Sequence, residues 1–293
     1  MKIFLTGASG FLGSALAHHL VSAGHEIAAL LRPASSLDRL QGIEATINVG
    51  RCTTVEEVET YLFRVQPDIV IHTACTYGRL GESLIQLADT NLQLGLIILQ
   101  ALQRTESSTT FINTGTVLKP EVSAYALSKH QFAQWGRFVT EKSSGKLRFI
   151  NVLLQHMYGP GDDKSKFTTH VLHACKSNQP KLELTTGEQK RDFIYIEDVV
   201  NAYSTLLDQS ARLEAALDIE VGSGVAPTIR EFVEVVHRLT ASCTKLQFGA
   251  LPYRNNEAMH CQADLTKMNE LGWQPKFDLE SGLKKTIELE SFQ

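Results

Sequence analysis

The feature that most constrains the fold is a glycine turn directly after a short apolar run. Ile3 to Leu5 reads as a buried strand, and Gly7, Gly10 and Gly13 follow it at intervals of three residues. Apolar residues then recur with helical spacing over residues 11–21. A helix that begins at such a turn offers free N–H groups and the positive end of its dipole to phosphates. Strand, turn and helix together predict a dinucleotide-binding unit.

Short apolar strands and amphipathic helices continue to alternate along the first half of the chain. Strands are expected at residues 26–31, 68–75 and 111–117, and helices at residues 55–65 and 83–103. This alternation predicts an α/β fold with a doubly wound parallel sheet, the Rossmann architecture. Ligands of such sheets bind at the carboxyl ends of the strands, so the polar residues that follow each strand are candidate site residues.

The composition argues against several classes of protein. The 293 residues are 43% hydrophobic with a formal net charge of -4 and no basic tract, so no nucleic-acid partner is expected. No apolar run approaches the length of a membrane span, roughly 20 residues, and the few apolar residues before Gly7 do not resemble a signal peptide. The five cysteines are scattered without a C-x-x-C pair, which indicates a cytoplasmic protein with reduced thiols and no metal site.

The end of the second strand indicates the type of dinucleotide. An acidic residue at this position accepts a hydrogen bond from the 2′-hydroxyl of NAD, whereas a nearby arginine accommodates the 2′-phosphate of NADP. Here the strand ends at Leu31, and Arg32, Ser35 and Ser36 follow without a carboxylate. The sequence therefore favours NADP, with NAD as the alternative if Arg32 is only a solvated charge.

A tyrosine and a lysine four residues apart form the candidate catalytic pair. Tyr125 and Lys129 lie in a segment of helix-forming composition that runs to Val139, so they share one face of the helix. An unperturbed tyrosine has a pKa of about 10, and a neighbouring ammonium lowers it toward the range useful for acid–base catalysis. By itself such a pair is more often two surface residues, but the preceding glycine turn favours the catalytic interpretation.

Several segments resemble the extended short-chain dehydrogenases, in particular the nucleotide-sugar branch known as the NAD-dependent epimerase/dehydratase family. The resemblance is carried by residues 6–13 (TGASGFLG), 68–75 (DIVIHTAC) and 187–199 (GEQKRDFIYIEDV), together with the tyrosine–lysine pair, and it covers nearly the whole chain. It implies an enzyme that binds NAD(P) and a nucleotide-diphospho-sugar, with the lysine also holding the nicotinamide ribose. The cofactor-binding residues that it implies are Gly7, Ser9, Gly10, Phe11, Leu12, Gly13, Arg32, Ser35, Ser36, Thr73, Ala74, Asn91, Tyr125 and Lys129.

In this family a Ser or Thr three residues before a Val orients the reacting carbonyl. Thr114, before Val117, matches that position and Thr116 is a close second, so the expected catalytic set is Thr114, Tyr125 and Lys129. The family's 4,6-dehydratases carry Asp-Glu directly after this Thr, and its 3,5-epimerase-reductases carry a Cys at this strand end. This chain has neither, which disfavours both elimination and double epimerisation.

The second half of the chain contains further substrate-binding positions that the resemblance implies. His156 stands where the family often has a substrate-contacting Asn, with a buried structural histidine as the alternative. Arg191 and Arg254 match the two arginines that hold the diphosphate, for which a planar guanidinium is well suited. Thr76 and Thr116 complete the expected substrate-binding set.

The resemblance also implies a division into two domains and a homodimer. The expected dinucleotide-binding domain spans residues 1–155, with residues 190–212 returning to it. The expected smaller C-terminal α/β substrate domain consists of residues 156–189 and 213–293. The helices predicted at residues 83–103 and 125–139 are expected to form the dimer contact, and no membrane partner is expected.

These features favour NADPH-dependent reduction of a nucleotide-diphospho-4-keto-6-deoxyhexose. The segments at residues 124–129 and 158–163 also resemble the bacterial CDP-abequose and paratose synthases, a narrower group of the family. One alternative is an NAD-dependent nucleotide-sugar 4-epimerase, which regenerates its own cofactor. A further alternative is a non-catalytic regulator that senses a dinucleotide.

Overall fold

A computed structural model describes residues 1–254 and 257–290, and these form two compact units. The first unit consists of residues 1–153 and 203–219, and the second consists of residues 154–202 and the described part of 220–293. The segment that returns to the first unit therefore begins at Tyr203 and ends at Ile219, rather than spanning the expected residues 190–212.

The first unit is built on a seven-stranded sheet with the order β11-β6-β5-β4-β1-β2-β3. The ladders that join β3, β2, β1, β4, β5 and β6 are all parallel, which confirms the predicted doubly wound α/β fold. Its elements are β1 (Lys2–Thr6), α1 (Phe11–Ser22), β2 (Glu26–Leu31), β3 (Asn48–Arg51), α2 (Val55–Val65), β4 (Ile69–His72), α3 (Leu84–Ala88), α4 (Leu94–Gln103), β5 (Thr109–Thr114), α5 (Ala124–Lys142), β6 (Leu147–Leu154), α7 (Ile196–Gln209, shared with the second unit) and β11 (Ala216–Val221).

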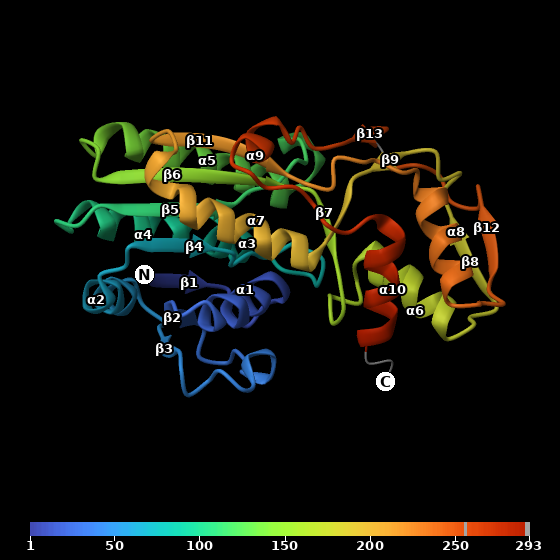
Figure 1. The fold of residues 1–293 in the computed structure, drawn as a ribbon, viewed down its shortest axis with the longest axis horizontal. Coiled ribbons are helices and arrows are strands. Elements are labelled where there is room, and N and C mark those ends of the chain that lie inside the picture. Colours follow the sequence, from blue (N-terminus) through green and yellow to red (C-terminus); the bar gives the residue numbers. More distant parts are fainter. Residues whose placement is uncertain (255–256, 291–293) are drawn as a thin grey trace. The chain divides into compact units, whose positions relative to one another are not determined.

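Helices cover both faces of this sheet (Figure 1). On one face α2, α4 and α5 pack against the strands around a core that includes Phe111, Phe132 and Phe149, all fully buried. On the other face α1 lies beside the later part of α7, where the His19 ring and the Ser204 hydroxyl are 3.3 Å apart. Because both faces are covered, the inner strands are continuously apolar rather than alternating.

Three predicted elements differ from those observed. The helix expected over residues 83–103 contains a π-helical turn, Asp89–Gln93, between α3 and α4. β4 ends at His72 and β5 at Thr114, so residues 73–75 and 115–117 are loops and not strand ends. Both loops follow strands at the carboxyl edge of the sheet, where loop backbone is available to shape a site.

The second unit contains short elements joined into three two-stranded parallel ladders, β10–β7, β12–β8 and β13–β9. The rings of Tyr158, Phe193, Tyr195, Phe232 and Phe277 contact one another in its interior. Its elements are β7 (His156–Tyr158), α6 (Phe167–Lys176), β8 (Lys181–Leu184), β9 (Lys190–Arg191), β10 (Phe193–Tyr195), α8 (Ile229–Leu239), β12 (Lys245–Phe248), β13 (His260–Cys261), α9 (Thr266–Glu270) and α10 (Leu279–Leu289).

One buried carboxylate organises the loops of the second unit. Asp192 is fully buried and accepts hydrogen bonds from the Ser223 amide (2.6 Å) and hydroxyl (2.7 Å) and from the amides of Gly224 (2.9 Å) and Ala263 (3.1 Å). A Cβ on Gly222 would lie 2.5 Å from the same carboxylate, so a side chain there would collide with it. Asp192 therefore holds residues 190–192 within the second unit, although the sequence places them near the expected domain boundary.

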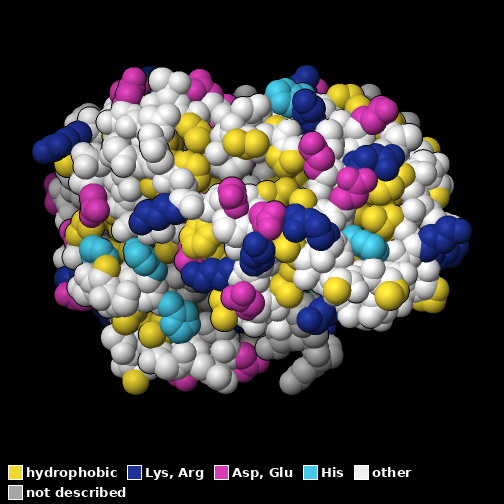
Figure 2. Space-filling model, turned by 45° about the vertical axis from the view of Figure 1, so that its right-hand side comes forward, with side chains coloured by type: hydrophobic (Ala, Val, Ile, Leu, Met, Phe, Trp, Pro, Cys, Tyr) yellow, Lys and Arg dark blue, Asp and Glu magenta, His cyan; other side chains and the backbone are white. Residues whose placement is uncertain are grey.

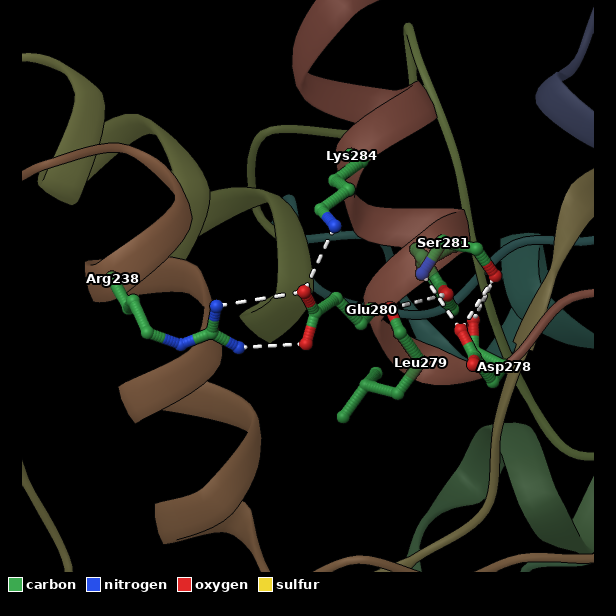
Figure 3. Close-up of polar contacts among 7 residues, drawn as sticks. Arg238, Asp278, Leu279, Glu280, Ser281 and Lys284 are labelled. Carbon is green, nitrogen blue, oxygen red and sulfur yellow. Dashed lines mark hydrogen bonds and ion pairs between the residues drawn. The ribbon is translucent and has the colours of Figure 1, made fainter.

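The start of α10 is fixed by side chains (Figure 3). Asp278 accepts a hydrogen bond from the Ser281 amide at 2.8 Å, which caps the helix. Glu280, one turn from Lys284, lies 2.8 Å from the Arg238 guanidinium of α8 and 2.9 Å from the Lys284 ammonium. Hydrogen bonds from these two cations lower the pKa of Glu280 to about 2. Because all three groups are exposed, we expect only a small, salt-sensitive contribution to stability.

Charges of both signs are interspersed over the face shown in Figure 2. Within residues 1–254 and 257–290, no helix combines the length and the apolar composition that are needed to span a bilayer. The same part of the chain contains no group of three or more His, Cys, Asp or Glu side chains placed to hold a metal ion. All five cysteines are free thiols.

Candidate active site

The glycine turn has the close packing that the sequence predicts. Gly7 adopts φ +71°, in the left-handed region, and its carbonyl accepts a hydrogen bond from the Gly10 amide at 2.9 Å. A Cβ on Gly13 would lie 2.1 Å from the Gly7 carbonyl oxygen, so only glycine lets α1 approach the turn this closely. Gly10 precedes α1 and supplies no side-chain cap, which leaves the first helical amides available to phosphate oxygens.

The loop after β4 lies directly against this turn. The Thr73 hydroxyl donates to the Thr6 carbonyl at 2.7 Å, and the Ala74 amide donates to the Thr6 hydroxyl at 3.2 Å. A Cβ on Gly7 would lie 2.6 Å from the Thr73 hydroxyl. His72, just before the loop, is fully buried, and burial lowers its pKa to about 3, so its ring is neutral at physiological pH. Thr73 and Ala74 thus border the glycine turn, as a dinucleotide site requires.

Asn91 fastens the same loop to α5. It lies in the π-helical turn and is fully buried. Its side-chain oxygen accepts from the Thr76 amide at 2.7 Å, and its nitrogen donates to the Thr76 carbonyl at 2.8 Å and to the Ser128 hydroxyl at 3.0 Å. Both amide hydrogens are therefore used within the protein. Asn91 thus joins Thr76 to Ser128 of α5, and the direct cofactor contact that the resemblance implies stays a prediction.

Tyr125 and Lys129 lie in the first two turns of α5. Ser123 caps this helix by accepting a hydrogen bond from the Ala126 amide at 3.1 Å, so the pair is held close to a well-defined helix start. Lys129 is 2% exposed, and its ammonium has no hydrogen-bond partner within the described residues. Burial lowers its pKa. A buried, unpaired ammonium is costly for a protein and indicates that a ligand completes its hydrogen bonds.

The surroundings of the Tyr125 phenol differ from the expectation. The sequence predicts a pKa lowered by the lysine, whereas burial raises the pKa of Tyr125, and a hydrogen bond from the Thr116 side chain only partly opposes this rise. Thr116 is buried, and its oxygen accepts from the Leu118 amide at 3.2 Å, which leaves its hydroxyl hydrogen for the phenol. The phenol is therefore protonated at neutral pH.

Thr114 has a different partner. Its hydroxyl lies 2.7 Å from the hydroxyl of Tyr203, a fully buried residue of α7 in the first unit. Thr114 is therefore paired with Tyr203, whereas Thr116 is the threonine whose side chain acts on the pKa of Tyr125. Between the two threonines, a Cβ on Gly115 would lie 2.5 Å from the Asn151 side-chain oxygen and 3.0 Å from the Val152 carbonyl. No acidic side chain could therefore occupy position 115.

Several further residues of the loop after β4 lie near Tyr125. The Tyr77 ring contacts the Tyr125 ring with a centroid distance of 4.8 Å, and the Arg79 guanidinium lies 5.0 Å from the Tyr77 ring centroid. Cys75 lies near enough to Tyr125 and Lys129 that its ionised form would raise the pKa of both. Cys75, Tyr77 and Arg79 follow β4, and this position in the sequence indicates that they lie near the site. By contrast, nothing in the sequence around Tyr203 indicates that this residue contacts Thr114.

The three substrate-binding residues predicted in the second unit, Arg191, Arg254 and His156, lie in different environments. The Arg191 side chain is buried, forms an ion pair with Glu257 and donates to the Lys190 carbonyl at 2.8 Å. The Arg254 side chain is exposed. The His156 ring packs edge-on against Phe193 with a centroid distance of 6.0 Å, and its amide donates to the Asp192 carbonyl at 3.1 Å.

The residues of the first unit fit a nicotinamide dinucleotide. The glycine turn and the uncapped start of α1 suit a pyrophosphate, and the unpaired Lys129 ammonium suits ribose hydroxyls. Arg32, Ser35 and Ser36 lie in the loop after β2, at the position of the adenosine ribose in such folds. The site therefore has the parts needed to bind the cofactor and to move a proton at Tyr125.

Comparisons with known proteins identify the family. A model of the NAD dependent epimerase/dehydratase family matches residues 3–222. The chain is 30% identical to the CDP-abequose synthase of Salmonella muenchen, over 98% of this chain and 97% of the relative, and 28% identical to that of Salmonella typhimurium, over 97% of each. The fold is similar to UDP-glucose 4-epimerase of Thermotoga maritima, with a TM-score of 0.86, 21% identity and coverage of 99% and 98%. The chain therefore belongs to the NAD dependent epimerase/dehydratase family and is an enzyme of the extended short-chain dehydrogenase type.

Proposed function

We propose that this enzyme uses NADPH to reduce the 4-keto group of a nucleotide-diphospho-4-keto-6-deoxyhexose. The observation that carries the proposal is the half-buried Tyr125, whose phenol is hydrogen-bonded to Thr116 and which lies one helical turn from Lys129 with its unpaired ammonium. Relatives named CDP-abequose synthase match the chain over nearly its full length, which supports a nucleotide-sugar substrate.

The residues of the site supply the proton and orient the ketone. When bound, the reduced nicotinamide provides the hydride for the carbonyl carbon. Tyr125 gives its phenolic proton to the carbonyl oxygen, and the raised pKa keeps this proton in place until the substrate binds. Lys129, four residues further along α5, would supply the positive charge that stabilises the resulting phenolate. The Thr116 hydroxyl would orient the carbonyl oxygen of the substrate. Arg191 and Arg254 would hold the diphosphate, with Glu257 leaving Arg191 as the anion binds.

The same strand end argues against elimination of water. A dehydratase needs an acid and a base beside the sugar, which the family's 4,6-dehydratases supply as Asp-Glu after the Thr. Here the corresponding residues are Gly115 and Thr116, and position 115 has no room even for a Cβ. A threonine hydroxyl does not ionise usefully at neutral pH. Reduction needs neither group, so this strand end supports a reductase.

The function is tested by supplying NADPH together with nucleotide-linked 4-keto-6-deoxy sugars carrying cytidine, guanosine, uridine or thymidine diphosphate. We expect oxidation of NADPH at 340 nm with one of them, and a 4-hydroxy product in the mass spectrum. The control is the same sugar with its 4-keto group already reduced, which should give no signal. An absence of NADPH oxidation with all four nucleotides would reject the reductase.

A 4-epimerase is the second candidate, because its chemistry uses the same tyrosine and lysine. It would retain tightly bound NAD through purification and interconvert 4-hydroxy sugars without added reductant. Bound NAD released by denaturation, together with such interconversion, would favour the epimerase. A non-catalytic sensor would instead bind the dinucleotide and turn over no sugar in either assay.

The two threonines provide a matched test of the site. Thr116→Val is expected to lower kcat about 100-fold, since it removes the hydroxyl that contacts Tyr125 and would orient the ketone. Thr114→Val is expected to leave kcat within about threefold. It should lower the free energy of unfolding by about 1–3 kcal/mol, because the Tyr203 hydroxyl loses its partner. Steady-state kinetics and denaturant unfolding measure both effects. A large loss of kcat in Thr114→Val with little change in Thr116→Val would show that Thr114 is the catalytic threonine.

A homodimer is proposed from the exposed apolar residues of α3 and α5. Leu84 and Ile85 are each 73% exposed, Phe138 is 54% exposed and Trp135 is 47% exposed. Phe138→Glu is expected to weaken dimerisation about 100-fold, because a two-fold interface loses the buried ring twice. Analytical ultracentrifugation measures this change. Phe63→Glu on α2 is the control, since Phe63 is also exposed, at 37%, but lies on another helix, and it should leave the dimer intact.

A further inference from the structure

Arg51 ends β3 directly beside the loop that follows β2. The parallel register pairs Leu31 with Arg51, so the chain leaves β2 next to this arginine. One guanidinium nitrogen, Nη1, donates to the carbonyls of Arg32 (3.1 Å), Pro33 (2.6 Å) and Ser35 (3.1 Å). A single side chain therefore donates hydrogen bonds to three carbonyls of the loop at residues 32–36.

This arrangement determines where the loop amides point. In a trans peptide the carbonyl and the following N–H point in opposite directions. Since the Pro33 and Ser35 carbonyls point toward Arg51, the amides of Ala34 and Ser36 point away from it. Neither amide donates a hydrogen bond within the described residues, whereas the Ser35 amide donates to the Arg32 carbonyl at 3.0 Å. Amides that are directed outward from a loop in this way bind anions.

No carboxylate neutralises the two arginines at this loop within the described residues. The guanidinium groups of Arg32 and Arg51 form no ion pair with a carboxylate in the part of the chain that the structure describes. The Nε and Nη2 groups of Arg51 donate no hydrogen bond to that part of the chain. The nearest acid along the loop, Asp38, is exposed, and its amide donates to the Ser36 hydroxyl at 3.0 Å.

We propose that Arg51 is a positioning and selectivity residue for the 2′-phosphate of NADP. It holds the loop so that the amides of Ala34 and Ser36 and the serine hydroxyls face the phosphate, and it adds a second guanidinium to that of Arg32. The inference rests on the NADPH preference proposed above. It assigns the selectivity to a residue of the neighbouring strand, not to the loop sequence alone.

The test compares binding of NADPH and NADH to the full-length enzyme and to Arg51→Met, with fluorescence of the reduced dinucleotide as the readout. Calorimetry with 2′,5′-ADP and 5′-AMP repeats the comparison without the nicotinamide. We expect Arg51→Met to weaken NADPH about 10- to 30-fold and NADH by less than about twofold. Arg51→Lys should be intermediate, because it keeps the charge but loses the Nε and Nη2 donors that Arg51 has left for the phosphate. Arg64→Met, which removes an exposed arginine of α2, should change neither affinity.

The outcomes separate this inference from the proposed function. A wild-type enzyme that binds NADH as tightly as NADPH would reject the cofactor proposal, whatever the variants do. A wild-type enzyme that prefers NADPH, with Arg51→Met weakening both dinucleotides equally or neither, would overturn the role of Arg51 alone. If Arg51→Met does not fold, the ratio of NADPH to NADH affinity in Arg51→Lys decides the question, since a purely structural role would leave that ratio unchanged.

Discussion

Replacing Tyr125 with Phe is expected to lower kcat about 1000-fold while leaving the dissociation constants of cofactor and substrate within a fewfold. The phenol is the proton donor in the proposed reaction, and positioned general acids contribute about 100- to 10,000-fold. Phe keeps the ring and its contact with Tyr77, so the change removes only the hydroxyl. Single-turnover kinetics with a 4-keto sugar measures the chemical step directly, and fluorescence titration measures binding.

Tyr61, a buried tyrosine outside the site, serves as the control for this variant. The Tyr61 hydroxyl donates to the Asn48 carbonyl at 2.8 Å, within the core between α2 and the sheet. Tyr61→Phe should lower stability by about 1 kcal/mol and leave kcat unchanged. If Tyr125→Phe kept more than a tenth of the wild-type rate, Tyr125 would not be the proton donor and the proposed mechanism would fail.

Replacing Lys129 with Met is expected to have opposite effects on activity and on stability. The rate should fall at least 100-fold, because the phenolate loses its neighbouring charge and the ribose loses its partner. The ligand-free protein should become more stable, since Met fills a similar volume without burying an unpaired ammonium. Thermal unfolding without cofactor measures the second effect. A ligand-free variant less stable than the wild type would indicate that Lys129 has a partner within the fold.

The stability difference should also depend on pH. Burial lowers the pKa of Lys129 in the folded protein, whereas the unfolded chain titrates near 10.4. Below the folded-state pKa both states are protonated, and the folded state carries the full burial penalty. As the pH rises toward 10.4 the unfolded state also loses its proton, so the penalty disappears. The gain in melting temperature of Lys129→Met over the wild type should therefore shrink as the pH rises toward 10.4, which parallel melts of both proteins can measure.

The glycine turn and the tyrosine–lysine pair could be predicted from the sequence because each depends on local geometry. Gly7 and Gly13 act within one turn and one helix, and residues four apart share a helix face wherever the helix lies. The alternation of strands and helices likewise predicts the parallel sheet, because the spacing of apolar residues that distinguishes a strand from a helix is visible within a few consecutive residues.

The partner of each side chain could not be predicted in the same way. Thr114 and Thr116 look equivalent along the chain, yet Thr114 contacts Tyr203, a residue 89 positions away, while Thr116 contacts Tyr125. Similarly, nothing near Arg191 indicates that Glu257, 66 positions later, would form its ion pair. Hydrogen-bond and ion-pair partners of this kind depend on how segments distant in the sequence pack together, and a local sequence pattern does not contain that information.

Residue spacing within single elements was sufficient to predict the type of fold and the glycine turn, and it also predicts the tyrosine–lysine pair as the acid–base residues. Only the folded structure shows that Thr114 pairs with Tyr203, that desolvation raises the pKa of Tyr125, and that one nitrogen of Arg51 contacts three carbonyls of the loop after β2. The physical reason is that hydrogen bonds and desolvation depend on separations of a few ångströms between residues that are far apart in the chain.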